Sequence, residues 1–177
     1  MAFIWVENFT DDVYVTYARG ITLEELRDRL VGVQPPLVLA EAKGWVYAVE
    51  TIDRARNAPD EPQVPAIAAS SGGAEVIFFS TRSWDPPSTF TYARDGLFAL
   101  GFGMGCGGEE EERLMGEGES DFLAPVLEAA GIIGEDDSRY EDEDFNLHGE
   151  ETIRAITDYF DLPEPPLGRF DPQLFTE

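Results

Sequence analysis

The sequence has few positively charged side chains. Its 177 residues include 12 Lys plus Arg against 36 Asp plus Glu, so the formal net charge is −24. A protein that binds nucleic acid through the phosphates needs a basic face, and so does a protein that adsorbs to an anionic membrane. The sequence therefore argues against direct nucleic-acid binding and against membrane binding.

Cysteine and long apolar runs are scarce as well. Cys106 is the single cysteine, which excludes an intramolecular disulfide and fits a reducing compartment. No apolar run approaches the roughly 18 residues that a membrane-spanning helix needs, and the first residues lack the basic region of a signal peptide. We expect a cytoplasmic protein without a cofactor.

Hydrophobic residues are nevertheless abundant enough for a core. They make up 43% of the sequence and aromatic residues 12%, which argues against a disordered polyacid. The length favours one domain over residues 1–177. We therefore expect a folded and very acidic single domain.

The negative charge is concentrated in the C-terminal part. Residues 1–106 carry 14 acids and 8 bases, a net of −6, whereas residues 107–177 carry 22 acids and 4 bases, a net of −18. We interpret 1–106 as a sheet-forming body and 107–177 as a strongly acidic helical flank.

Periodicity predicts an α+β fold with an antiparallel sheet of about five to six strands. Alternating apolar and β-branched residues indicate strands at 2–6, 12–18, 44–51 and 75–83. Asp95-Gly96 between the runs 89–93 and 97–102 predicts a β-hairpin. The consecutive strands and the grouping of the helices argue against a parallel α/β sheet.

One helix is predicted in the N-terminal half and two in the flank. Thr22 and Glu25 form a capping-box pattern before a helix at 23–30. A second helix is expected at 121–130, with Ser120 as N-cap and Gly131 after its end, and a third at 150–162 before Pro163. The stretch 53–65, with three prolines, is expected to be an exposed loop.

Two sequence patterns are typical of functional sites, one of dinucleotide binding and one of cysteine catalysis, but neither is supported by the residues around it. Residues 103–108 match the glycine pattern of dinucleotide-binding loops, but four glutamates follow directly and would repel a diphosphate. Cys106 and the single histidine, His148, form no recognisable catalytic motif, and no basic residue near Cys106 would stabilise a thiolate. We expect a glycine connector there and no catalytic residues.

The acidic tract at 135–146 has a partial calcium-loop pattern. Asp142, Asp144 and Asn146 fall at positions 1, 3 and 5 of such a loop. Position 6 is Leu147 instead of glycine, and position 12 is Ile153 instead of glutamate. A solvated acidic loop is the favoured interpretation, with Ca²⁺ binding as the alternative.

Three segments resemble an uncharacterised actinobacterial domain-of-unknown-function family. They are YVTYARGITLEELRDRL, GWVYAVE and FTYARDGLFAL, within residues 13–102. The resemblance implies no activity, so no functional residue is carried over from it. It implies turns at Gly20 and Gly96 and a core position for Trp45. Arg19 and Arg94 each follow a Tyr-Ala pair, and we expect them to anchor the acidic flank by bidentate pairing.

The charge pattern predicts a non-enzymatic interaction protein with a basic protein partner, because complementary charge accelerates association. An immunity-type inhibitor of a cationic toxin or nuclease is the favoured form, by analogy. A DNA mimic, and an enzyme or calcium-binding protein using residues 135–146, are the alternatives. Oligomeric state is left open. The expected partner-binding residues are Glu109, Glu110, Glu111, Glu112, Asp136, Asp137, Glu141, Asp142, Glu143 and Asp144.

Overall fold

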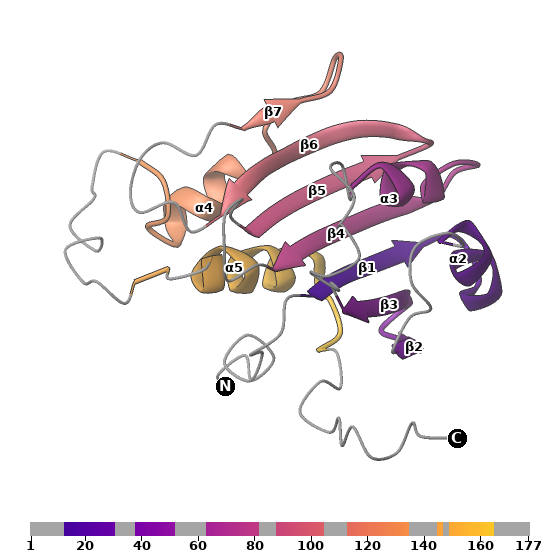
Figure 1. The fold of residues 1–177 in the computed structure, drawn as a ribbon. Helices are drawn as coiled ribbons and strands as arrows, with labels where there is room; N and C mark the ends of the chain where they lie inside the picture. Colours follow the sequence, from indigo (N-terminus) through magenta and orange to yellow (C-terminus); the bar gives the residue numbers. More distant parts are fainter. Residues whose placement is uncertain are drawn as a thin grey trace.

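A seven-stranded antiparallel sheet forms the centre of the protein, with helices on both faces (Figure 1). The computed structural model describes residues 13–30, 38–51, 63–81, 88–104, 113–134, 145–146 and 149–164. The strands are β1 (Val13–Arg19), β2 (Val38–Ala42), β3 (Trp45–Thr51), β4 (Glu75–Thr81), β5 (Ser88–Arg94), β6 (Leu97–Met104) and β7 (Leu114–Met115). The described helices are α2 (Leu23–Arg29), α3 (Gln63–Ala69), α4 (Ala124–Ala129) and α5 (Glu150–Phe160). The predicted α+β class is confirmed.

The strand order is β2-β3-β1-β4-β5-β6-β7. The predicted hairpin joins β5 and β6, and its turn residues Asp95 and Gly96 have φ values of 53° and 77°. Two consecutive residues with positive φ match the twist of the flanking strands, which is why Asp-Gly is favoured there. The strands expected at 12–18, 44–51 and 75–83 correspond to β1, β3 and β4, whereas the one expected at 2–6 lies outside the described residues.

Each face of the sheet carries its own apolar cluster because successive side chains of a strand point to opposite faces. Val15 and Tyr17 of β1 pack on one face with residues of α4 and α5, including Leu127 and Ile153. Tyr14 of β1 packs on the other face with residues of α2 and α3. We call these the α4/α5 face and the α2/α3 face.

The helices of the acidic flank therefore complete a core with the body. Leu123, Leu127, Ile153 and Ile156 are all fully buried in the cluster on the α4/α5 face. That residues 1–177 form a single domain stays a prediction, because this core is seen only for the described parts of that range. No helix within the described ranges is long and apolar enough to cross a membrane.

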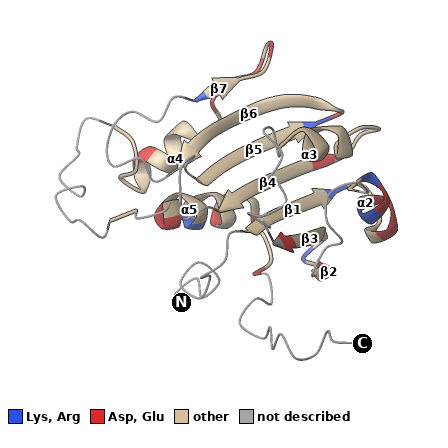
Figure 2. Ribbon diagram, viewed as in Figure 1, with Lys and Arg blue, Asp and Glu red and all other residues tan. Residues whose placement is uncertain are grey.

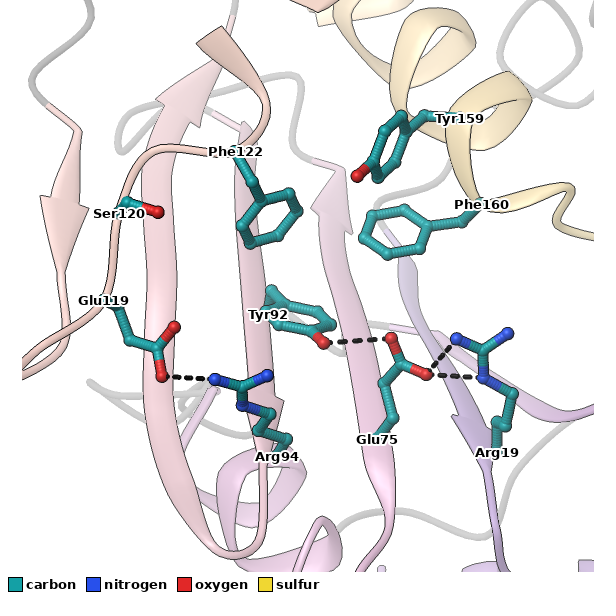
Figure 3. Close-up of a pocket in the computed structure, with 9 residues that line it drawn as sticks. All are labelled: Arg19, Glu75, Tyr92, Arg94, Glu119, Ser120, Phe122, Tyr159 and Phe160. Atoms are coloured by element: carbon teal, nitrogen blue, oxygen red, sulfur yellow. Dashed lines mark hydrogen bonds and ion pairs between the residues drawn. The ribbon is translucent and has the colours of Figure 1, made fainter.

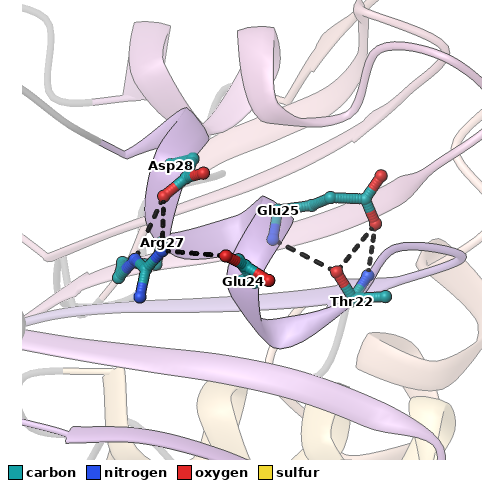
Figure 4. A network of polar contacts seen from close by, with 5 residues as sticks. All are labelled: Thr22, Glu24, Glu25, Arg27 and Asp28. Carbon is teal, nitrogen blue, oxygen red and sulfur yellow. Dashed lines mark hydrogen bonds and ion pairs between the residues drawn. The ribbon is translucent and has the colours of Figure 1, made fainter.

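The start of α2 has the predicted capping box (Figure 4). The Thr22 hydroxyl accepts a hydrogen bond from the backbone N–H of Glu25 at 3.2 Å, and the Glu25 carboxylate accepts one from the backbone N–H of Thr22 at 2.7 Å. The hydrogen bonds that the Glu25 carboxylate accepts from the N–H and from the hydroxyl of Thr22 lower the pKa of Glu25. Two N–H groups that the first turn of a helix leaves unpaired are thereby satisfied.

We expect Thr22→Ala to reduce the free energy of unfolding by about 1 kcal/mol, because the replacement removes the acceptor for the Glu25 N–H. Thr22→Ser keeps the hydroxyl and is the matched control. Urea unfolding followed by circular dichroism measures both variants. An alanine variant as stable as the serine variant would contradict a stabilising role of this cap.

The structure differs from the expected elements in three places. Residues 63–65 lie in α3 and not in an exposed loop, because Ala66 and Ala69 pack onto the sheet and proline is tolerated in the first turn of a helix. The sheet also gains β2 and β7 at its edges, which raises the strand count above six.

The predicted N-cap of the helix at 121–130 is also wrong. The helix α4 begins at Ala124, and its N-terminal N–H at Ala124 is bonded to the Asp121 carboxylate at 3.0 Å and not to Ser120. Arg113 pairs with the other oxygen of Asp121 and fixes this carboxylate. At the far end, Gly131 has the predicted left-handed conformation, with φ of 70°.

Candidate functional site

The two Tyr-Ala-Arg segments lie on either side of β4. In the strand register, Arg19 of β1 and Arg94 of β5 are both opposite Glu75 of β4. The residues two positions before the arginines, Tyr17 and Tyr92, belong to the cluster on the α4/α5 face. Strand alternation therefore places both guanidinium groups and the Glu75 carboxylate at one end of that face.

Within the described residues, Arg19 pairs with the body and not with the acidic flank, which contradicts that part of the prediction. Its Nε and Nη2 both donate to Oε2 of Glu75. The guanidinium also lies over the ring of Trp45, 4.6 Å from the ring centroid. Trp45 is buried, as predicted, and its face favours a cation at this distance.

Glu75 has a second partner in the buried phenol of Tyr92. The Tyr92 hydroxyl donates to Oε1 of Glu75 at 2.9 Å. Burial and the neighbouring carboxylate together raise the pKa of Tyr92 to about 12, so this tyrosine remains a hydrogen-bond donor. Both oxygens of Glu75 are thus engaged by donors within the protein.

Arg94 does anchor the acidic flank, as predicted, although through one contact instead of two. Its Nη2 donates to Oε1 of Glu119 at 2.7 Å. A second link between body and flank is the ion pair of Lys43 with Asp161 at the end of α5. These pairs hold the two ends of the described flank against the sheet.

An aromatic wall stands over the charged row (Figure 3). Phe122 precedes α4, while Tyr159 and Phe160 end α5. The ring of Tyr92 lies 5.1 Å from that of Phe122 and 5.6 Å from that of Phe160, and Phe122 stacks on Tyr159 at 6.0 Å. Aromatic pairs at such distances stabilise one another beyond the area that they bury.

Together these side chains line an open pocket of about 560 Å³. Its volume falls in the range of roughly 300–1,000 Å³ that is typical of small-molecule sites. The lining residues are Arg19, Glu75, Tyr92, Arg94, Glu119, Ser120, Phe122, Tyr159 and Phe160. Two arginines and two glutamates make the charged lining neutral overall, and the rest is mainly aromatic.

The residues predicted to bind a basic partner lie outside the described residues. This holds for Glu109, Glu110, Glu111 and Glu112, and for the acidic positions 136, 137 and 141–144. Cys106 and His148 lie outside them too, whereas Gly103 and Met104 end β6. The interpretation of these segments stays a prediction.

Of the candidate calcium ligands, only Asn146 is described, and its side chain hydrogen-bonds to the first turn of α5. Its Oδ1 accepts the backbone N–H of Thr152 at 3.1 Å, and its Nδ2 donates to the Thr152 hydroxyl at 3.0 Å. The side chain is buried, with 3% of its surface exposed. The oxygen expected to face a cation is thus directed to the first turn of α5. Within the described ranges, no group of three or more His, Cys, Asp or Glu side chains could hold a metal ion.

Sequence reasoning singled out the two arginines but missed Glu75 and the aromatic wall. Glu75 is the one charged residue of its strand, EVIFFST, and this charge before the apolar run is the signal that the sequence offers. Phe160 packs against the core, and its position at the pocket depends on how α5 lies on the sheet. Comparison of the chain with protein-family models, with curated proteins and with solved structures finds no significant match.

Proposed function

We propose that the chain is a non-enzymatic, cytoplasmic interaction protein that captures a basic protein through its acidic surface. The favoured partner is a cationic toxin or nuclease, which the protein would inhibit in the manner of an immunity protein. The resemblance to an uncharacterised actinobacterial family is compatible with this proposal and adds no activity to it.

The observation that carries the proposal is that the described cations are already used inside the chain. The described ranges contain seven Lys and Arg against sixteen Asp and Glu. Six of the seven pair with carboxylates, and Arg29 donates to the backbone carbonyls of Ala69 and Ser71. Figure 2 shows the described charges mainly on helices and turns, with the strands largely uncharged.

With these cations engaged inside the chain, the sixteen acids and seven bases of the described ranges leave a surplus of nine negative charges. Surface charge of one sign attracts a partner of the opposite sign and raises the association rate. Such attraction is screened by salt, with a Debye length of about 10 Å at 0.1 M and about 3 Å at 1 M. A basic partner should therefore be bound at low salt and released at high salt.

We expect the immobilised protein to retain a strongly basic protein from a lysate of its own host at about 50 mM NaCl and to release it at about 500 mM. The purified partner should then bind in calorimetry with the same salt dependence. If the partner is a nuclease, a molar equivalent of the protein should abolish its activity.

Two variants with equal net charge distinguish a local binding site for the basic partner from a general effect of the net charge. One replaces Glu109, Glu110, Glu111 and Glu112 with glutamine. The other replaces four exposed and scattered acids, as Glu117→Gln, Glu128→Gln, Asp158→Asn and Glu164→Gln. We expect the first variant to bind at least tenfold more weakly than the second. Retention of no basic protein at either salt concentration, or equal loss in the two variants, would argue against this binding surface.

A further inference from the structure

We propose that the pocket over the Arg19–Glu75–Arg94 row binds a small organic anion, namely a carboxylate carried by a flat aromatic group. This inference is independent of the proposed capture of a basic protein. It rests on the unused hydrogen-bond donors of the pocket, on its aromatic wall and on the balance of its charges.

The hydrogen-bonding capacity that remains in the pocket is mostly of the donor kind. Glu75 accepts two bonds from Arg19 and one from Tyr92, so both of its oxygens have donors. Arg94 uses Nη2 for Glu119, while its Nε and Nη1, and Nη1 of Arg19, have no acceptor among the described residues. A guanidinium carries five N–H donors and no acceptor, and pairs well with a carboxylate.

Both arginines are accessible to a ligand. The side chains of Arg19 and Arg94 are 53% and 54% exposed, in contrast to 17% for Glu75 and 25% for Glu119. The hydroxyls of Ser120 and Tyr159 face the same opening (Figure 3) and are also unpaired within the described part of the chain. An incoming anion would thus meet the positive groups before the less exposed carboxylates.

The aromatic wall indicates that the ligand carries a flat aromatic group in addition to its carboxylate. Phe122 and Tyr159 lie side by side with their rings nearly parallel, at an interplanar angle of 28°, and Phe160 meets Tyr159 edge to face at 4.8 Å. A flat ring can stack on such a surface and remove apolar area from water. An aliphatic anion of the same charge would forgo this contact.

The charges favour one carboxylate over a phosphate or a cation. A cation would have to displace Arg19 or Arg94 from their carboxylates, because both glutamates are already paired. A phosphate dianion would bring two negative charges next to Glu75 and Glu119. A single carboxylate can use the free donors of Arg94 and compete only with Glu119 for Nη2. The net charge of −24 opposes any anion at long range, but salt limits that effect to about 8 Å at physiological ionic strength.

The test uses 2-naphthoate as the probe and neutral 2-naphthamide as its matched control. The ring is identical in the two compounds, so only the carboxylate differs. We expect calorimetry and ligand-observed NMR to give saturable one-to-one binding of 2-naphthoate with a dissociation constant of about 0.1–1 mM, as suits a fragment of this size. The amide should bind at least tenfold more weakly.

Variants assign the binding to this pocket. Arg94→Ala should weaken 2-naphthoate binding at least tenfold, and Arg94→Gln should do the same if the alanine variant folds poorly. Arg27→Ala removes one positive charge from α2 on the other face and should leave the affinity unchanged. Glu119→Gln should tighten binding several-fold, because the ligand then meets no competing charge at Arg94.

Three results would overturn the proposal. The first is the absence of saturable 2-naphthoate binding at about 5 mM, a concentration well above the expected dissociation constant. The second is an equal affinity for 2-naphthoate and for 2-naphthamide. The third is an equal loss of 2-naphthoate affinity in Arg94→Ala and in Arg27→Ala. None of these results bears on the capture of a basic protein, which uses different residues and a different readout.

Discussion

Glu50→Gln is expected to stabilise the protein by about 3 kcal/mol at pH 8 and to leave its stability nearly unchanged at pH 4. Glu50 lies on β3 opposite Tyr14 of β1, with 2% of its surface exposed. Its Oε1 has no hydrogen-bond partner among the residues that the structure describes. Burial raises the pKa of this carboxyl from 4.5 to about 7.

The direction of the pH effect follows from which state holds the proton. Between pH 4.5 and about 7 the unfolded chain has released the proton of Glu50, whereas the folded protein retains it. Raising the pH through this interval therefore favours unfolding. The loss of stability caused by the buried Glu50 is complete above pH 7 and absent below pH 4.5. At about 1.4 kcal/mol per pH unit, the interval corresponds to about 3 kcal/mol.

Urea unfolding at several pH values, with the variant compared to the native protein, isolates this contribution from those of other groups. Glu41→Gln on the neighbouring strand β2 removes an exposed carboxylate and is the matched control. A stability difference between Glu50→Gln and the native protein that does not grow from pH 4 to pH 8 would contradict the raised pKa of Glu50.

Ile153→Ala is expected to lower the free energy of unfolding by about 3 kcal/mol. Ile153 is fully buried between α5 and the sheet, in one cluster with Val15, Phe79 and Leu127. The replacement removes the contacts of three carbon atoms and leaves a cavity that close-packed surroundings fill only in part. For a chain of this length the loss corresponds to a fall in melting temperature of about 6–12 °C.

The same variant tests whether the acidic flank is energetically part of the body. Circular dichroism near 218 nm, where strands contribute, and fluorescence of the tryptophans should both report the lower stability if α5 and the sheet unfold together. Asp158→Ala, exposed on the same helix, is the control and should change stability by less than about 0.5 kcal/mol. An unchanged transition for the sheet in Ile153→Ala would show that α5 unfolds independently.

The elements that the sequence predicts well are those whose signal is local. The alternation in β1 and β3, the Asp-Gly turn between β5 and β6, and the capping box of α2 each depend on neighbouring residues alone. The Gly131 end of α4 belongs to the same group. Its N–H and that of Ile132 bond to the carbonyls of Glu128 and Leu127, the pattern that a left-handed glycine permits.

The elements that it predicts poorly depend on distant partners. β2 follows two prolines and has half-buried residues on both faces, so its pairing with β3 gives no clear alternation. α3 has Pro65 in its first turn and only seven residues, and an isolated helix of that length is not stable in water. Packing of Ala66 and Ala69 against the α2/α3 face stabilises it.

The sequence by itself determined the α+β class and the excess of negative charge. It also indicated Arg19 and Arg94 as residues that form ion pairs. Those properties follow from composition and from spacing over a few residues. Only the tertiary structure decided that β1 and β5 flank β4, which places both arginines beside Glu75. It also decided that the end of α5 lies over these charged residues, where Tyr159 and Phe160 form part of the aromatic wall of the pocket. Residues up to about 140 positions apart line this pocket, and no local pattern encodes how they come together.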